Sequence, residues 1–272
     1  MSYRPGRLVL LGHPVAHSLS PRFQNAALRS ARIPIVYEAI DVPGDRLRAT
    51  LDALRAVDAA GNVTIPHKEA VAALCDDLTA VARRARAVNT FWTQDGRLSG
   101  DNTDVGGFQA AVSELCADPP RVVALFGAGG GASAALTAVE AWRGARARVY
   151  SRTRRRTQSL CSRFDSIATA ANSGSEAVRG ADLVVNTTPV GLLDDAMPID
   201  PSVLDAGTAV LDLVYRPGGT AWVRSARARG LIVSDGTAML LEQGALAFER
   251  WFGLAPDRRA MREALASASG SQ

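Results

Sequence analysis

The chain has 272 residues, 47% of them hydrophobic, which is enough apolar material for two ordinary domains with separate cores. Its 31 basic and 27 acidic residues leave a formal charge of +4. Because the basic residues are dispersed among the acidic ones, we expect no nucleic-acid partner. No apolar run approaches the roughly 18 residues that span a bilayer, so we expect no membrane partner either.

The cysteines and histidines form no recognisable metal or redox motif. The three cysteines are widely spaced, as expected for unpaired thiols in a reducing compartment. His13 and His17 are four residues apart, but Pro14 argues against the helix that would align them on one face. We therefore expect no bound metal and a cytoplasmic location.

The first half of the chain alternates between strand and helix patterns. In chain order we predict a strand at 7–12, a helix at 21–32 opened by Ser20 and Pro21, a strand at 35–40, a helix at 45–57, a strand at 61–65 and a helix at 67–85. A strand pair follows within 87–99, with Asp95-Gly96 as its predicted turn. This half is therefore predicted to be an α/β unit.

The second half repeats this alternation after a break. A predicted helix, N-capped by Thr103 and ending near Cys116, leads into Asp118-Pro119-Pro120, and we place a domain boundary across that helix. Further strands are predicted at 122–126, 147–150, 182–187, 209–214 and 231–233. Because strands that alternate with helices form mostly parallel sheets, we predict an α/β fold with two domains.

Lys68 is the only lysine in the chain, against 30 arginines. Unlike a guanidinium, an ammonium can lose and regain a proton near neutral pH when its pKa is lowered. We predict that Pro66 is the first residue of a helix, which puts Lys68 near the positive end of the helix dipole and favours its neutral form. Lys68 is thus a candidate acid/base. The alternative is that an arginine-biased composition left one lysine by chance.

A glycine-rich loop follows the strand predicted at 122–126. Its residues are Gly127, Ala128, Gly129, Gly130, Gly131 and Ala132, and an alanine-rich helix pattern continues to Trp142. This is the GxGxxA form of the dinucleotide fingerprint, placed between a strand and a helix as that fingerprint requires. It predicts a Rossmann-type doubly wound parallel sheet with a pyrophosphate at the helix N-terminus. The alternative is a tight strand-to-helix connection without a ligand.

The end of the next predicted strand indicates which dinucleotide binds. An NAD enzyme would offer Asp or Glu to the ribose hydroxyls here, but this chain has Ser151, Arg152, Thr153 and Arg154, followed by two more arginines. Guanidinium groups suit a 2′-phosphate because they meet it with paired donors, so we predict NADP. An exposed helix start or a nucleic-acid patch are the alternatives. The position about 20 residues past the glycines favours the cofactor.

Several short motifs resemble, in the same order, those of the shikimate dehydrogenase family. They run through almost the whole chain: Gly12-His13-Pro14-Val15-Ala16-His17-Ser18-Leu19-Ser20-Pro21, Asn62-Val63-Thr64-Ile65-Pro66-His67-Lys68, Ala87-Val88-Asn89-Thr90, Asp101-Asn102-Thr103-Asp104, Asn186-Thr187-Thr188-Pro189-Val190-Gly191, Asp212-Leu213-Val214-Tyr215, and Met239-Leu240 with Gln243. Each motif alone is weak, but their joint presence in the family's order is specific.

The resemblance implies a two-domain, NADP-dependent enzyme of aromatic amino-acid (chorismate) biosynthesis. It implies that residues 1–103, joined by 239–272, form the substrate-binding catalytic domain, and that 104–238 form the NADP-binding Rossmann domain. The implied reaction is reversible hydride transfer from NADPH to 3-dehydroshikimate, giving shikimate. Quinate, amino-shikimate or another hydroxy acid is the alternative substrate within the family. A dinucleotide-sensing regulator without turnover is an alternative of another class. We expect a monomer or a homodimer.

The same resemblance implies the roles of individual residues. Lys68 and Asp104 are implied to be the catalytic pair. The implied substrate-binding residues are Ser18, Ser20, Asn62, Thr64, Lys68, Asn89, Asp104, Tyr215 and Gln243. The implied cofactor-binding residues are the six of the glycine-rich loop, the four from Ser151 to Arg154, Thr188 and Met239. Short hydroxyl, amide and carboxylate groups suit the recognition of a small polyhydroxylated acid.

Two spacings agree with these implied roles. Ser18 and Ser20 are two apart in a predicted extended stretch, so both hydroxyls would face one side and could share one carboxylate. Met239 and Gln243 are four apart on a predicted helix, so one helix face could meet both nicotinamide and substrate. The alternatives are core packing for Met239 and Tyr215, and turn or capping roles for the serines and asparagines.

Three residues depart from the family's usual pattern. Gln24 stands where histidine is usual, Ser151 where asparagine is usual, and Ala238 where glycine is usual. None of the three is assigned to proton or hydride transfer. They therefore bear on substrate preference and rate rather than on the type of reaction.

Overall fold

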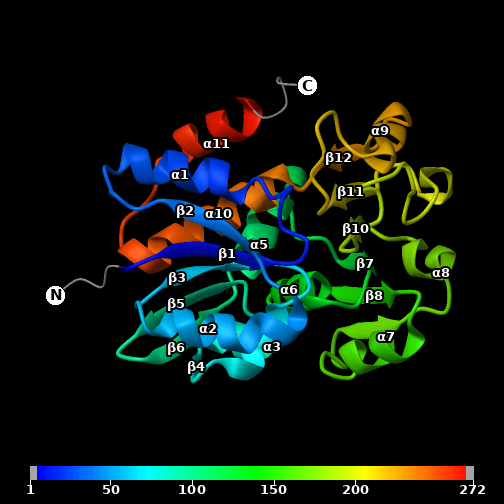
Figure 1. Cartoon of the computed structure of the whole chain (residues 1–272). Coiled ribbons are helices and arrows are strands. Elements are labelled where there is room, and N and C mark those ends of the chain that lie inside the picture. Colours follow the sequence, from blue (N-terminus) through cyan, green and yellow to red (C-terminus); the bar gives the residue numbers. More distant parts are fainter. Residues whose placement is uncertain (1–4, 268–272) are drawn as a thin grey trace. The chain divides into compact units, whose positions relative to one another are not determined.

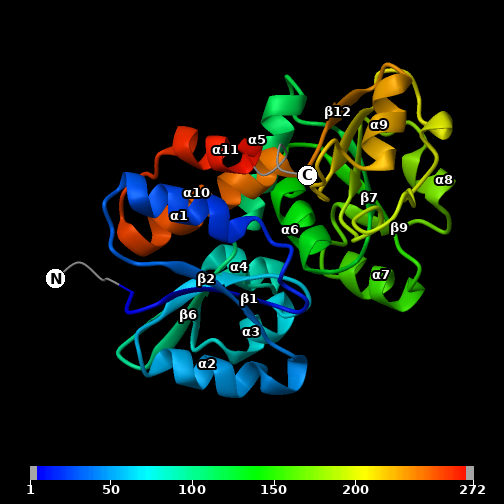
Figure 2. The same cartoon turned by 45° about the horizontal axis from the view of Figure 1, so that its top comes forward.

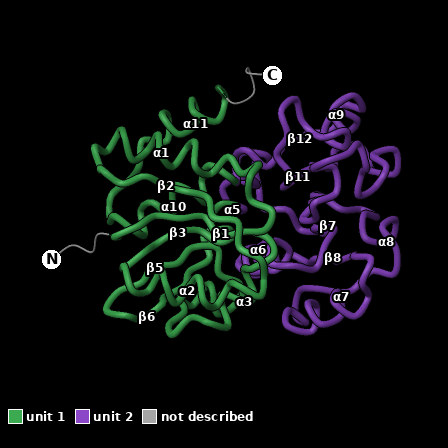
Figure 3. Tube along the Cα trace, in the orientation of Figure 1, with its two compact units in different colours: residues 1–107, 240–272 green, residues 108–239 purple. Residues whose placement is uncertain are grey.

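The structure is a computed structural model that describes residues 5–267. The chain divides into two compact units (Figure 3). Unit 1 comprises Met1–Gly107 and Leu240–Gln272, and unit 2 comprises Phe108–Met239. The chain passes from one unit to the other inside two helices, α5 (Asp104–Leu115) and α10 (Thr237–Phe252).

Unit 1 contains a mixed six-stranded sheet with the order β2-β1-β3-β5-β6-β4 (Figure 1). Its strands are β1 (Leu8–Gly12), β2 (Tyr37–Asp41), β3 (Ala60–Val63), β4 (Asp77–Leu78), β5 (Thr90–Gln94) and β6 (Arg97–Asp101). β5 runs antiparallel to both of its neighbours. Asp95 and Gly96 join β5 to β6 with φ of 52° and 73°, the positive values that a tight two-residue hairpin turn needs, which confirms the predicted hairpin.

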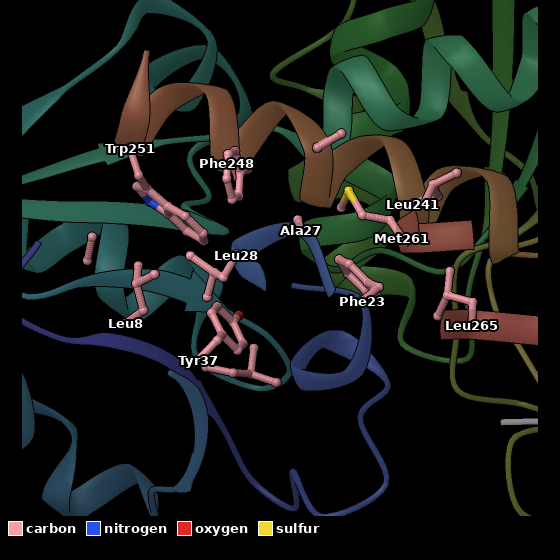
Figure 4. Close-up of a cluster of buried hydrophobic side chains, with 14 of the residues drawn as sticks. Leu8, Phe23, Ala27, Leu28, Tyr37, Leu241, Phe248, Trp251, Met261 and Leu265 are labelled. Carbon is pink, nitrogen blue, oxygen red and sulfur yellow. The ribbon is translucent and has the colours of Figure 1, made fainter. Parts of the chain in front are cut away.

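Helices cover both faces of the unit 1 sheet (Figure 2). One face packs against α1 (Ser20–Ser30), α10 and α11 (Arg258–Ala266), and the other against α2 (Leu47–Arg55), α3 (Lys68–Leu74) and α4 (Ala80–Ala85). Because side chains alternate along a strand, Leu8 and Leu10 of β1 join the first core and Val9 and Leu11 the second. Figure 4 shows the first core, in which Trp251 of α10 lies near Tyr37 of β2.

The single helix predicted at 67–85 is wrong, because the chain forms two short helices with β4 between them. Asp76 Oδ2 accepts a hydrogen bond from the backbone N–H of Leu98 (2.7 Å), and β4 pairs in parallel with β6. Thr79 then starts α4 by accepting from the backbone N–H of Ala82 (3.2 Å). Pairing with a strand that comes later in the chain thus overrides the local helix pattern.

Unit 2 contains a six-stranded parallel sheet with the order β12-β11-β10-β7-β8-β9. Its strands are β7 (Val122–Phe126), β8 (Arg146–Tyr150), β9 (Ala168–Ala170), β10 (Leu183–Asn186), β11 (Ala209–Asp212) and β12 (Ile232–Ser234), and its further helices are α6 (Gly130–Val139), α7 (Arg154–Cys161), α8 (Gly174–Val178) and α9 (Ala221–Ala228). This is the doubly wound order, and the direction of winding reverses between β7 and β10. Ligands of such sheets bind beyond the carboxyl ends of the strands at this reversal.

The sequence did not predict β9, which has three residues and pairs only with β8 among the described strands. Within residues 5–267, every helix is too short or too polar to cross a lipid bilayer.

Candidate active site

Lys68 and Asp104 form an ion pair in unit 1. Lys68 Nζ lies 2.6 Å from Asp104 Oδ2, and the two side chains are 19% and 6% exposed. Each is the first residue of its helix, α3 and α5 respectively. The prediction that Pro66 opens the helix is wrong, because the backbone N–H of His67 donates to Thr64 O (3.0 Å) and closes a turn over the intervening residues. α3 therefore begins at Lys68 itself.

Asn89 holds the other oxygen of the Asp104 carboxylate and also contacts Gln243. Asn89 Nδ2 donates to Asp104 Oδ1 (2.8 Å) and to Gln243 Oε1 (3.2 Å). Gln243 projects from α10, where its Nε2 donates to Leu240 O (2.8 Å). Residues that are far apart in the sequence thus meet in one buried polar cluster, which we call the Lys68 cluster: Lys68, Asn89, Asp104 and Gln243.

Thr103 does not cap α5 through its side chain as predicted. Instead, Asn102 Oδ1 accepts from the backbone N–H of Val105 (3.3 Å). The Thr103 hydroxyl is turned inward, where it accepts from Asn89 Nδ2 (2.9 Å). The capping signal in this motif is therefore carried by the asparagine, and the threonine belongs to the polar network under the site.

Ser18, Ser20 and Thr64 follow the carboxyl ends of β1 and β3, which are neighbouring parallel strands. The predicted extended stretch at the serines is wrong, because Ser20 is the first residue of α1 and its backbone N–H donates to Ser18 Oγ (3.3 Å). Ser20 is buried and Thr64 half-buried. Within the described part of the chain, neither the Ser20 nor the Thr64 hydroxyl makes a hydrogen bond to protein, so both can serve a ligand.

Asn62 is engaged beneath these residues rather than free. It is 5% exposed, and its Nδ2 donates to Asn89 O (3.1 Å) and to Thr90 Oγ1 (3.0 Å). Its Oδ1 accepts from the Tyr37 hydroxyl (2.8 Å). Both amide hydrogens of Asn62 are thus used inside the protein. Sequence reasoning gave no role to Tyr37 or Thr90, although Thr90 ends the motif Ala87-Val88-Asn89-Thr90, because only the tertiary fold brings them to Asn62.

In unit 2 the glycine-rich loop has the geometry that a phosphate-binding turn requires. Gly127 has a φ of 123°, and a Cβ there would lie 2.3 Å from Thr187 Oγ1, so only glycine fits. Gly129 precedes α6, and a Cβ on it would meet open space, which leaves its backbone accessible. Ala132 is fully buried. These are the three positions that the dinucleotide fingerprint specifies.

The arginine run lies at the start of α7, directly after β8. Arg152, Arg154, Arg155 and Arg156 are all exposed, and none of them makes an ion pair with another residue in the range 5–267. Positive charge at a helix N-terminus is unfavourable for the helix, so stability does not explain this cluster. Such a cluster of exposed guanidinium groups is suited to an anionic ligand.

A buried carboxylate orders the loops that carry Thr188 and Tyr215, at the ends of β10 and β11. Asp212 Oδ1 accepts from Asn186 Nδ2 (2.9 Å) and Oδ2 accepts from Thr220 Oγ1 (2.6 Å). Asn186 Oδ1 in turn accepts from the Thr188 hydroxyl (2.6 Å). Thr188 and Tyr215 are half-buried, and Met239, near the start of α10, is buried.

This carboxylate makes stability depend on pH in an unusual direction. Burial raises the pKa of Asp212 above its ordinary value of 3.8, while hydrogen bonds from Thr220, Val214 and Asn186 act against this rise. A folded-state pKa above the unfolded one gives stability that is fully present below the unfolded pKa and is lost as pH rises through the folded pKa. We expect the unfolding free energy of Asp212→Asn minus that of the wild type to increase as pH rises from 4 to 7. Urea unfolding of both proteins at each pH measures this difference. A difference that does not change with pH, or that falls, would contradict this.

Two segments of the chain match known domain families. Residues 10–91 match the shikimate dehydrogenase substrate binding domain, and residues 236–266 match the shikimate 5′-dehydrogenase C-terminal domain. Over 266 residues the chain is 44% identical to the shikimate dehydrogenase (NADP(+)) of Rubrobacter xylanophilus, a match that covers 94% of each chain. The chain belongs to the shikimate dehydrogenase family.

Solved structures agree with membership of the shikimate dehydrogenase family. The shikimate 5-dehydrogenase of Thermus thermophilus, in complex with NADP(H) and shikimate, is 40% identical with a TM-score of 0.87, covering 96% of this chain and 99% of that one. The quinate dehydrogenase of Corynebacterium glutamicum, in complex with NAD, is 31% identical with a TM-score of 0.85, covering 96% and 98%. The predicted family and fold class are confirmed.

Two of the departures from the shikimate dehydrogenase pattern have clear surroundings. Gln24 is 1% exposed, and its Nε2 donates to Gly244 O (2.9 Å), which ties α1 to α10 next to Gln243. Ser151 Oγ is 2.7 Å from Thr157 Oγ1, so it steadies the first turn of α7. Ala238 lies half-buried in the first turn of α10. None of the three replaces a member of the Lys68 cluster.

Proposed function

We propose that this protein catalyses the NADP-dependent, reversible reduction of 3-dehydroshikimate to shikimate in aromatic amino-acid biosynthesis. Membership of a family whose similar members are NADP-dependent shikimate dehydrogenases supports this function. The observation that carries it is the ion pair of Lys68 with Asp104, whose second carboxylate oxygen accepts from Asn89, itself in contact with Gln243. An acid/base held in this way suits reduction of a ring carbonyl.

Unit 1 is proposed to bind the substrate. Ser18 and Ser20 would hold its carboxylate. The residues around its hydroxyls would be Asn62, Thr64, Asn89, Tyr215 and Gln243. Many short polar groups are needed because each ring hydroxyl must find a partner when it leaves water.

Unit 2 is proposed to hold NADP. Gly127 to Ala132 would bind the pyrophosphate, Ser151 to Arg154 the adenosine 2′-phosphate, and Thr188 and Met239 the nicotinamide half. The open space at Gly129 fits this ligand, as do the exposed guanidinium groups of Arg152 and Arg154, which make no ion pair within residues 5–267. When bound, NADPH supplies the hydride for the reaction.

Lys68 is proposed to move the proton. Reduction of the carbonyl builds negative charge on its oxygen, and the ammonium of Lys68 would donate a proton there. In the reverse direction the amine would accept the proton of the reacting hydroxyl. Asp104 holds Lys68 Nζ at 2.6 Å and would also orient that hydroxyl, so that the proton has a short path.

We further propose a cytoplasmic location and a monomeric or homodimeric state. The free cysteines Cys75, Cys116 and Cys161 suit a reducing compartment.

Initial rates with the purified protein test the proposed function. NADP reduction is measured with shikimate and with quinate as substrate, and each reaction is repeated with NAD. We expect the highest kcat/KM for shikimate with NADP. A higher kcat/KM for quinate would assign the protein to the other activity of the family, and no turnover of either acid would contradict an enzymatic role.

Replacement of Ser20 tests the proposed site for the substrate carboxylate. Ser20→Ala removes a hydrogen bond to a charged group, worth roughly 1.5 to 3 kcal/mol, so the KM for shikimate should rise by about tenfold to a hundredfold. The KM for NADP should not change. Ser30→Ala is the matched control, because Ser30 lies on the same helix and its hydroxyl donates to Asp257 Oδ2 (3.0 Å). A loss of NADP affinity with unchanged shikimate affinity would show that the ligands are assigned to the wrong units.

A further inference from the structure

A buried chain of hydrogen bonds leads to Asp104 and includes a residue without an assigned role. Thr90, the first residue of β5, is fully buried. Its Oγ1 accepts from Asn62 Nδ2 (3.0 Å) and donates to Asn89 Oδ1 (3.1 Å). Asn89 Nδ2 donates to Asp104 Oδ1 (2.8 Å), and Asp104 Oδ2 accepts from Lys68 Nζ (2.6 Å). Two hydrogen bonds therefore separate Thr90 from the carboxylate that holds Lys68.

Two backbone groups fix the direction of this chain. Asn89 O can only accept, so Asn62 turns its Nδ2 towards it (3.1 Å), and Asn62 Oδ1 accepts from the Tyr37 hydroxyl (2.8 Å). The backbone N–H of Thr103 can only donate, so Asn89 turns its Oδ1 towards it (2.7 Å) and its Nδ2 towards Asp104. Along this path, from the Tyr37 hydroxyl to Asn89 Nδ2, each group donates to the next one towards the Asp104 carboxylate. Thr90 Oγ1 also lies 3.0 Å from Thr103 Oγ1, and Asn89 Nδ2 also donates to Thr103 Oγ1 (2.9 Å).

The shared direction of these hydrogen bonds affects the Asp104 carboxylate. Hydrogen bonds aligned head to tail polarise one another, and this strengthens the last bond, from Asn89 to Asp104. If the Asn89 amide turned over, its Oδ1 would face the carboxylate and repel it. Burial raises the pKa of Tyr37 well above its ordinary value, so its hydroxyl keeps the proton and stays a donor at neutral and mildly alkaline pH.

We propose that Thr90 is a positioning residue for the reaction: together with the backbone N–H of Thr103, its hydroxyl holds the Asn89 amide in the orientation that fixes Asp104 against Lys68. This inference rests on the proposed function, since it concerns the same site. Thr90 acts through Asn89 and Asp104. Its loss should therefore lower turnover while leaving NADP binding intact.

A matched pair of variants tests the proposal in the full-length protein. Thr93 lies on the same strand and is also fully buried, but its Oγ1 donates to Ala59 O (2.7 Å), outside the chain that leads to Asp104. Thr90→Val and Thr93→Val each replace a buried hydroxyl by a methyl group of similar shape, so both should lower Tm by a similar amount. In shikimate oxidation, kcat should fall roughly three- to tenfold in Thr90→Val and stay within about twofold of the wild type in Thr93→Val.

Further variants separate positioning from a structural effect. Thr90→Ser keeps the hydroxyl and should restore most of the kcat. In an Asp104→Ala background, adding Thr90→Val should lower kcat by a further factor of less than about two, because the carboxylate that Thr90 positions is gone. Tyr37→Phe removes the first donor of this hydrogen-bond chain while keeping the ring. It should also lower kcat and leave the KM for NADP unchanged.

Several results would overturn the proposal: a normal kcat in Thr90→Val, an equal loss in Thr93→Val, or a Thr90→Ser enzyme as slow as Thr90→Val. These leave the proposed function standing as long as the wild type oxidises shikimate with NADP. If the wild type does not turn over shikimate, the proposed function and the positioning role fall together.

Discussion

Lys68→Arg is expected to lower kcat by about two to four orders of magnitude, the usual loss when a positioned acid/base is removed. Arginine keeps the positive charge and can still pair with Asp104, but a guanidinium does not release its proton in a protein. The fold should survive, because Lys68 is the first residue of a short helix and belongs to neither hydrophobic core of unit 1. Steady-state kinetics with shikimate and NADP measure the change.

Controls distinguish proton transfer from charge. Lys68→Ala should be as slow as Lys68→Arg, and titration with NADP should give an unchanged affinity in both variants, because the cofactor is proposed to bind unit 2. Near-normal turnover in Lys68→Arg would show that the lysine acts only as a charge and that another group moves the proton. Tyr215 would then be the next residue to replace.

The double variant Arg152→Ala with Arg154→Ala is expected to abolish most of the preference for NADP over NAD. Each charge-assisted hydrogen bond to the 2′-phosphate contributes roughly 1.5 to 3 kcal/mol, so the loss of two should lower kcat/KM for NADP by about a hundredfold or more. The efficiency with NAD should not change, because NAD lacks that phosphate. Both efficiencies are measured with saturating shikimate.

Arg156→Ala is the matched control for this double variant. Arg156 lies in the same exposed run, so its replacement also removes a positive charge, but it is not among the residues proposed to bind the cofactor. The effect of this replacement should be small. If the wild type used NAD as well as NADP, or if Arg156→Ala were as damaging as the double variant, the assignment of the 2′-phosphate to Arg152 and Arg154 would be wrong.

The sequence was most informative where the signal is local. β7 occupies the predicted residues 122–126, because an apolar run bounded by Pro119-Pro120 and Gly127 leaves little freedom. The hairpin at Asp95-Gly96 formed as predicted because positive φ at both turn residues is a property of the turn itself. The motifs likewise sufficed to identify the family.

Local patterns failed where distant segments compete for the chain. The predicted helix at 67–85 is interrupted because β4 pairs with β6, and nothing in the sequence of that range indicates this pairing. The serine stretch was predicted to be extended, yet α1 begins at Ser20. Tyr37 joins the polar network only through its tertiary contact with Asn62. Thr90 and Thr103 stand beside Asn89 and Asp104 in the motifs, but only the tertiary fold brings Thr90 to Asn62 and Thr103 to Asn89.

The most direct test of the proposed reaction follows the hydride itself. The wild-type protein is incubated with 3-dehydroshikimate and NADPH that carries deuterium at both positions of nicotinamide C4, and the product is identified by mass spectrometry. We predict shikimate with one deuterium on the carbon that bore the carbonyl, formed in equal amount to the NADP produced. Recovery of unchanged 3-dehydroshikimate, or of shikimate without deuterium, would contradict hydride transfer from NADPH as the reaction of this protein.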